Sequence, residues 1–525
     1  MATPSTVSNG FPARTVLTVC TLIIALPVLS LPFLAAFPAE NIWPHLVSTV
    51  LPGYVATTLR LMLGVGALTF LIGVATAWFV TMHRFPGQAF FRWALLLPLA
   101  MPAYVVAYVY TDLLEYAGPV QRGLRALAGW HSAREYSFPE IRSLGGAIVV
   151  MGLVFYPYVY LLARGAFLEQ SVASLEASRT LGCSPWAAFR RVALPGARPA
   201  IAVGLSLVLM ETLNDFGTVD FFGVNAMTAG VFDVWLNMDN LGGAAQLSLV
   251  MLIFVIALVT IERLSRRRQR HYTPRAVRRP AEPSRLRGWQ AAGAFGLCAI
   301  PVGFGFFIPV AILARYALRN LPEAFDGAFV RHAANSFWLA LGSAVLTLIV
   351  GMAYAYAMRL RPQPYIRCLA RSASLGYAVP GAVLAIGVLV PFAAIDNSVD
   401  AAAREWLGVS TGLLLSGTPL AILFAYSVRF LTVSLGGIES SLAKVTPSMD
   451  MAARTLGLRP GQVFLRVHLP LIRVGMLAAG TIVFVDCIRS FRPRSCFARS
   501  ISTPSPPIST SSPPTSRSSR PRSAR

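Results

Sequence analysis

Residues 61–80 read LMLGVGALTFLIGVATAWFV, a run without a single charged side chain. About 20 apolar residues are enough for a helix to cross the hydrocarbon core of a bilayer. Residues 339–358, LALGSAVLTLIVGMAYAYAM, form a second run of the same kind. A transmembrane β-barrel would need alternating polar and apolar residues, which neither run has. Both runs therefore predict transmembrane helices.

The whole chain has the composition that these two runs suggest. It has 525 residues, of which 55% are hydrophobic and 13% are charged, about half the charged share of soluble domains. We predict an all-α polytopic membrane protein. The expected spans are residues 15–37, 55–80, 91–111, 145–167, 198–222, 245–262, 289–316, 335–360, 370–395, 411–432 and 472–488.

The net charge of +23 indicates membrane topology rather than nucleic-acid binding. The basic residues fall mainly in short segments between apolar runs, and such segments stay on the cytoplasmic side. The Arg-rich segment 263–288 is therefore expected to be a cytoplasmic linker, which also places the N-terminus inside. The expected outer segments 38–54 and 223–244 contain no Lys or Arg. We expect a lipid bilayer, and no nucleic acid, as a partner.

The residues that would indicate catalysis or metal binding are scattered. The six cysteines form no C-x-x-C pair, the six histidines are dispersed, and no triad is evident. The P-loop motif G-x-x-x-x-G-K-[ST] is absent from the sequence. We therefore expect no catalytic residue and no metal site, and any ATP hydrolysis must take place on another polypeptide.

The chain contains an internal duplication. Leu63-Gly64, Leu68-Thr69 and Gly73 recur 278 residues later, with Gly73 matching Gly351. A polar stretch also recurs, because Arg179-Thr180-Leu181-Gly182 returns 275 residues later and ends at Gly457. Both copies fall on the same predicted face, so each repeat has an even number of spans. We predict two tandem, like-oriented repeats of about six transmembrane helices, residues 1–262 and 289–488.

The duplicated polar loops, residues 171–196 and 445–471, have a readable local structure. Gly182 suits the left-handed position that ends a helix, and Ser184 can cap a second helix with Pro185 at its first position. Pro195 is expected to end that second helix. The loop is then two short helices joined by a sharp bend that projects into the cytoplasm. A plain re-entry turn between spans is the alternative.

The loops resemble a signature of the inner-membrane permeases of ATP-binding-cassette importers. That signature reads E-A-A, three residues, G, nine residues, I, one residue, L-P. The first copy matches it at Glu176, Ala177, Ser178, Gly182, Val192, Leu194 and Pro195. The second copy has Met451 in place of the glutamate, preceded by Asp450, and keeps Ala452, Ala453, Gly457, Val467, Leu469 and Pro470.

The resemblance implies that each loop is a coupling helix that docks into a groove of a separate ATPase subunit. It further implies a periplasmic substrate-binding protein as a partner, a multi-pass location in the bacterial inner membrane, and a chain that is not itself an enzyme. The chain would bind no cofactor, and ATP would be used by the ATPase. The implied coupling residues are Glu176, Ala177, Gly182, Leu194, Pro195, Ala452, Gly457, Leu469 and Pro470.

Two stretches, from Leu96 to Gln121 and from Met210 to Gly223, look like the fused permeases of ferric-iron importers. Permeases for thiamine, polyamines or phosphonates share much of this pattern, and an ion-coupled secondary transporter is a reading from another class. Glu211, Asp215 and Asp486 are acids within or at the end of expected spans. They could line a cationic pathway, or they could satisfy backbone or arginine partners inside the bundle.

The last segment, residues 489–525, is a low-complexity Ser/Pro/Arg tail without an acidic residue. Such a sequence can neither form a packed core nor span lipid. We hypothesise that it is a frameshift product, so that the second repeat is truncated and its last helix is missing. A genuine basic tail is the alternative.

Overall fold

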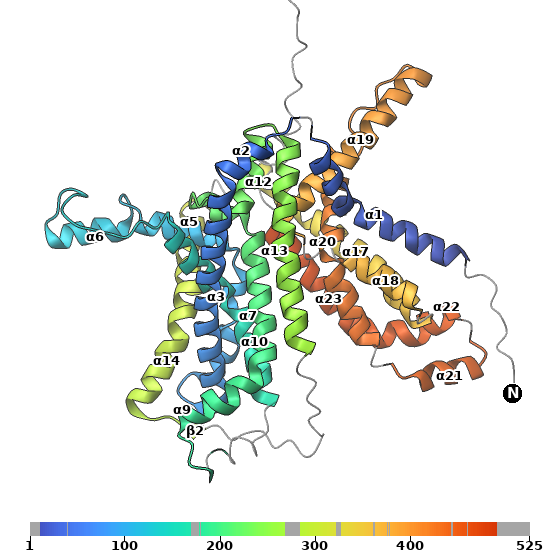
Figure 1. Ribbon diagram of the computed structural model, residues 1–525. Coiled ribbons are helices and arrows are strands. Elements are labelled where there is room, and N and C mark those ends of the chain that lie inside the picture. Colours follow the sequence, from blue (N-terminus) through green and yellow to red (C-terminus); the bar gives the residue numbers. More distant parts are fainter. Residues whose placement is uncertain are drawn as a thin grey trace, which may run out of the picture. The chain divides into compact units, whose positions relative to one another are not determined.

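The computed structural model describes residues 11–38, 40–169, 178, 180–267, 284–321, 327–360, 363–374, 376, 379–442, 445–458 and 460–490. Helices dominate this part of the chain (Figure 1). Its one sheet is a parallel pair of two-residue strands, β1 (His83–Arg84) and β2 (Ser284–Arg285). Residues 491–525, the predicted low-complexity tail except for its first two residues, lie outside the described residues.

The predicted all-α polytopic class is confirmed. Ten helices among the described residues are long and apolar enough to cross a membrane, or eleven if one bent pair counts as a span. The long elements are α1 (Phe11–Ala36), α3 (Leu51–Met82), α7 (Leu144–Glu169), α10 (Leu194–Asn214), α13 (Leu241–Arg267), α14 (Gly288–Val302) continued by η3 (Gly303–Phe307) and α15 (Ile308–Arg319), α17 (Gly327–Leu360), α19 (Gly381–Leu407), α20 (Pro419–Leu442) and α23 (Leu469–Ser490).

Shorter helices lie between the long ones. They are α2 (Trp43–Ser48), α4 (Gln88–Ala94), η1 (Leu97–Ala100), α5 (Ala103–Leu114), α6 (Pro119–Ala128), α11 (Phe216–Phe221), α12 (Met227–Leu236) and α18 (Pro364–Ala373). The expected span 91–111 is wrong as a single helix. Residues 88–100 and 103–128 meet at an angle of 89°, because Pro102 has no N–H and holds Met101 in an extended conformation.

Three other expected spans are displaced by local backbone chemistry. The expected span 370–395 covers parts of two helices, since α18 ends at Ala373 and Pro380 is the cap that precedes α19. Span 411–432 starts too early, because Gly408 and Gly412 have positive φ and α20 begins only at Pro419. Span 198–222 ends at Asn214, where the next residue caps a separate helix.

Two sets of three spans pack pairwise in the same pattern. α3, α7 and α10 contact one another, and so do α17, α20 and α23. Equivalent glycines allow the close approach in both sets. A Cβ on Gly73 would lie 2.7 Å from Cβ of Val159 in α7, and one on Gly351 would lie 2.6 Å from Oγ of Ser434 in α20. These matches support the predicted two-repeat organisation, which stays a prediction.

The first span of each predicted repeat packs on the other repeat. α1 contacts α18 and α19, where a Cβ on Gly387 would lie 2.1 Å from the carbonyl oxygen of Pro27. Thr21 of α1 also shares a hydrogen bond of 2.7 Å with the Tyr354 hydroxyl of α17. α14 contacts α3 and α4, with the Phe91 and Phe295 rings 5.2 Å apart. The two halves of the sequence are therefore interlocked.

Gly73→Ala should destabilise the α3–α7 contact by about 1–3 kcal/mol, since the added methyl group has no room between backbone and side chain. Gly165→Ala in α7 is the matched control, because nothing lies within 4 Å of its Cβ position. Thermal unfolding in detergent, followed by size-exclusion chromatography, measures the difference. Equal midpoints for the two variants would contradict this packing.

Candidate functional site

The first polar loop contains the predicted bend. Gly182 has φ 81°, the left-handed conformation expected of it. Ser184 caps the next helix, α9 (Pro185–Ala188), because its Oγ accepts a hydrogen bond of 3.3 Å from the Ala187 amide. Pro185 occupies the first helical position. The predicted coupling residues Glu176 and Ala177 lie outside the described residues.

The second loop repeats this bend. α21 (Pro447–Thr455) ends just before Gly457, which has φ 77°. The Leu456 and Leu458 amides donate to the carbonyl oxygens of Ala452 and Ala453, each at 3.2 Å. α22 (Pro460–Val463) then begins on the far side of the bend. The predicted helix–bend–helix is thus present in this copy.

The prediction that Pro195 ends the second short helix is wrong. The π-helical turn η2 (Phe189–Ala193) joins α9 to α10, so one helix runs from Pro185 to Asn214. In the second copy η5 (Phe464–His468) joins α22 to α23 across Pro470 in the same way. A π turn shifts the hydrogen-bond register by one residue. This shift allows the helix to pass a residue that has no N–H.

An aromatic pair fixes each bent segment to the end of a neighbouring span. Trp78 of α3 lies 4.8 Å from Phe189 of η2, with the rings inclined at 56°. Tyr356 of α17 lies 4.9 Å from Phe464 of η5, inclined at 60°. Such tilted aromatic pairs stabilise a contact by more than the burial of their apolar area alone. The two copies therefore share an anchor as well as a backbone path.

A polar cluster adds a second anchor in the second copy. Asp450 Oδ2 accepts hydrogen bonds from Arg359 Nη2 at 2.8 Å and Nε at 3.2 Å, while Asp450 Oδ1 lies 2.6 Å from His468 Nε2. Arg359 also donates to the carbonyl oxygens of Leu442 and Val445. Burial alone would raise the pKa of Asp450, but the hydrogen bonds from His468 and Arg359 lower it. We call Arg359, Asp450 and His468 the clasp.

Two of the three predicted pathway acids, Glu211 and Asp486, lie near two arginines. Arg429 of α20 and Asp486 and Arg489 of α23 all lie close enough to interact electrostatically with Glu211 of α10. Asp486 pairs with Arg489 at 3.7 Å. Asp215 has a structural use as well.

The carboxylate of Asp215 caps α11, accepting from the Thr218 amide at 3.0 Å and from its hydroxyl at 2.6 Å. Carboxylates and arginines thus share this site. Among the described residues, no group of three or more His, Cys, Asp or Glu could hold a metal ion. Asp486 therefore pairs with an arginine, and Asp215 with the amide and hydroxyl groups of Thr218.

Comparison with known proteins bears on what these loops serve. Residues 69–271 match the binding-protein-dependent transport system inner membrane component family. This segment belongs to that family of permeases. It contains the first bend, the first π turn and the whole of α10. The expected recognition as an ABC-type permease is confirmed, and the family is one of multi-pass inner-membrane transport components rather than enzymes.

Individual relatives of the permease differ in how much of it they match. An Fe(3+)-transport system permease protein, FbpB 2 of Haemophilus influenzae, is 26% identical over 440 residues, which cover 83% of this chain and 79% of the relative. The molybdenum transport system permease protein ModB of Escherichia coli is 27% identical over 41% of this chain. A putative 2-aminoethylphosphonate permease protein, PhnU of Salmonella choleraesuis, is 26% identical over 41% of it. The ferric relative thus matches both halves of the permease.

Both bends of the permease expose large apolar side chains. Leu181 is 84% exposed and its equivalent Leu456 is 81% exposed. Trp186 of α9 and Met451 of α21 are also exposed. Exposed apolar groups that recur at equivalent points of two loops are typical of a surface that a partner covers.

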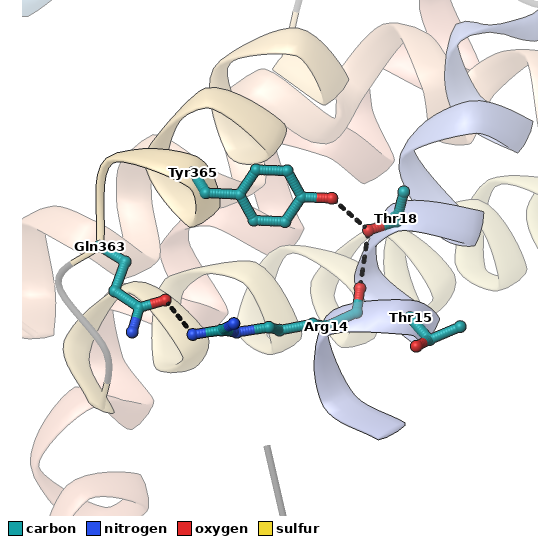
Figure 2. A pocket seen from close by; sticks show the side chains of 5 residues that line it. All are labelled: Arg14, Thr15, Thr18, Gln363 and Tyr365. Atoms are coloured by element: carbon teal, nitrogen blue, oxygen red, sulfur yellow. Dashed lines mark hydrogen bonds between the residues drawn. The ribbon is translucent and has the colours of Figure 1, made fainter. Parts of the chain in front are cut away.

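A polar hollow between α1 and α18 is a structural joint. Arg14, Thr15, Thr18, Gln363 and Tyr365 line about 490 Å³ (Figure 2). Arg14 Nη2 donates to Gln363 Oε1 at 2.7 Å, and the Thr18 and Tyr365 hydroxyls share a hydrogen bond of 2.8 Å. These side chains bridge the first span of one repeat to the other repeat.

The clasp is not predicted by the sequence. Asp450 stands out there only as the residue before Met451, which fills the position of the missing glutamate. Arg359 counted as a topology signal, and His468 as one of several scattered histidines. No local pattern links positions that are 91 and 18 residues apart, so the sequence offered no signal for their meeting.

Gly182→Val should destabilise the first bend by about 1–2 kcal/mol, because a side chain is strained in the left-handed conformation. Gly182→Asn should cost less, since Asn tolerates that region. Gly461→Val is the matched control, because its Cβ position is also open and its φ is not positive. Hydrogen exchange of residues 180–188 measures the loss. Equal exchange in the two valine variants would contradict a strained bend.

Proposed function

We propose that this chain is the permease of an ATP-driven importer that takes up ferric iron delivered by a periplasmic binding protein. The observation that supports ferric iron as the substrate is the length of the match to the Fe(3+)-transport permease, which covers 83% of the chain. The molybdenum and phosphonate relatives each match 41% of the chain. A match of 440 residues takes in parts of both predicted repeats.

In this proposal a separate ATPase docks on both bends. Gly182, Leu194, Pro195, Ala452, Gly457, Leu469 and Pro470 shape the docking elements, together with Glu176 and Ala177. The exposed Leu181 and Leu456 supply apolar contact, and the unbroken helices 185–214 and 461–489 carry displacement into the bundle. ATP is bound and hydrolysed by the ATPase, and the chain itself binds no cofactor and catalyses no reaction. The N-terminus and both bends lie on the cytoplasmic face.

Phosphonate transport is the second candidate, favoured by the similarity to the putative 2-aminoethylphosphonate permease protein. The two arginines near Glu211 would suit an anion or an iron complex with anionic ligands. Thiamine and polyamine transport, and ion-coupled secondary transport, have no comparable observation in their favour.

Substrate uptake separates these candidates. Cells that express the chain with its ATPase and binding protein should accumulate ⁵⁵Fe supplied as ferric citrate, and unlabelled ferric citrate should compete. Accumulation of labelled 2-aminoethylphosphonate without iron uptake would contradict the ferric assignment. Uptake that persists without any ATPase would contradict the ATP-driven class.

The double variant Glu211→Gln/Asp215→Asn should lower iron uptake by about tenfold or more while the ATPase still co-purifies, since acids inside a span act on the cargo or its gate. Glu405→Gln is the control, because Glu405 is exposed. Normal uptake by the double variant would reject a pathway role and leave these acids as partners of arginine and backbone groups.

A further inference from the structure

The clasp lies where four elements of the second repeat meet. Arg359 stands one residue before the end of α17, and its guanidinium reaches the carbonyl oxygen of Leu442 at the end of α20. Asp450 belongs to α21, and His468 closes the π turn η5 that leads into α23. One carboxylate therefore connects the coupling helix to three spans.

Both carboxylate oxygens of Asp450 are bound by side chains of the same chain. Its two oxygens contact Arg359 and His468, and its side chain is only 23% exposed. His468 is 3% exposed and its ring faces Tyr356 at 5.7 Å. A group held in this way is poorly placed to reach another polypeptide. Asp450 therefore does not simply replace the missing glutamate of the motif one residue earlier.

The first repeat lacks this arrangement. By the offsets of the matching elements, Arg359 corresponds to Thr81, Asp450 to Leu175 and His468 to Ala193. The first copy has instead Glu176 at the motif position that Met451 fills in the second. The two loops thus differ in where their acid is used, since Glu176 holds the signature position and Asp450 is bound within the chain.

We propose that the clasp is a positioning device that couples α21 rigidly to α17, α20 and α23, so that displacement of the second docking loop moves those spans together. The proposal rests on ATPase docking at the bends. Charge-assisted hydrogen bonds fix the relative geometry of two groups more specifically than apolar contacts do. Loss of one partner leaves an uncompensated charge at a half-buried site. Breaking the clasp therefore loosens α21 without removing the surface on which the ATPase docks.

The mechanical part of the proposal is tested on the purified permease alone. In Asp450→Asn, the amides of residues 448–455 should exchange hydrogen about tenfold faster than in the wild type, as expected for losing a charge-assisted hydrogen bond. Glu439→Gln, which removes an exposed carboxylate at the end of α20, should leave exchange unchanged. Unchanged exchange in Asp450→Asn would overturn the proposal.

A second variant covers a failure of Asp450→Asn to fold. Arg359→Met/Asp450→Leu leaves no unpaired charge, and apolar replacement of a buried ion pair is often tolerated. It should fold and show the same faster exchange in residues 448–455. Wild-type exchange in this variant would equally overturn the proposal.

The coupling part is tested on the complex. Asp450→Asn should retain co-purified ATPase and lower the ⁵⁵Fe taken up per ATP hydrolysed by about tenfold, the factor that corresponds to the loss of one charge-assisted hydrogen bond. Glu176→Gln should instead reduce the amount of co-purified ATPase. Loss of ATPase from Asp450→Asn, with α21 still protected from exchange, would make Asp450 a docking contact and overturn the clasp. A wild-type chain that binds no ATPase would refute the proposed function, and the exchange result alone would then decide the clasp.

Discussion

A helix that crosses a membrane must satisfy its backbone groups within itself, yet each of the two bent segments of this chain carries a proline at the entrance to a long span. The conflict is resolved by the π turns η2 and η5, which shift the hydrogen-bond register beside Pro195 and Pro470. Each bend is thereby continuous with a span of the bundle. Without these turns, a break in the helix would separate each exposed bend from its span. Displacement of the bend would then not move the span.

The two repeats use this shared backbone path differently. The first holds its elbow with aromatic rings, since Phe189 contacts Trp78, Phe167 and Trp186. The second keeps the Tyr356–Phe464 pair and adds the clasp around Asp450. Because α1 and α14 each pack on the opposite repeat, both bent segments lead into one interlocked bundle.

Much of this organisation follows from local patterns. Apolar runs predict the spans, and the Gly182 and Gly457 bends follow from a glycine placed before a cap and a proline. The boundaries around Pro102, Pro380 and Pro419 were misplaced because apolar content continues across residues whose backbone cannot stay helical. Pro195 was misjudged because a π turn leaves no compositional signature. The clasp, and the packing of each repeat's first span on the other repeat, depend on contacts between residues far apart in the sequence, which no local pattern encodes.

The central claim is that the two elbows share one face of the membrane and act together. Its most direct test places single cysteines at Leu181 and Leu456, which are equivalent and exposed, in a background without native cysteines. A membrane-impermeant thiol reagent should label both positions in inside-out vesicles and neither in right-side-out cells. Labelling of the two positions from opposite sides would contradict the account.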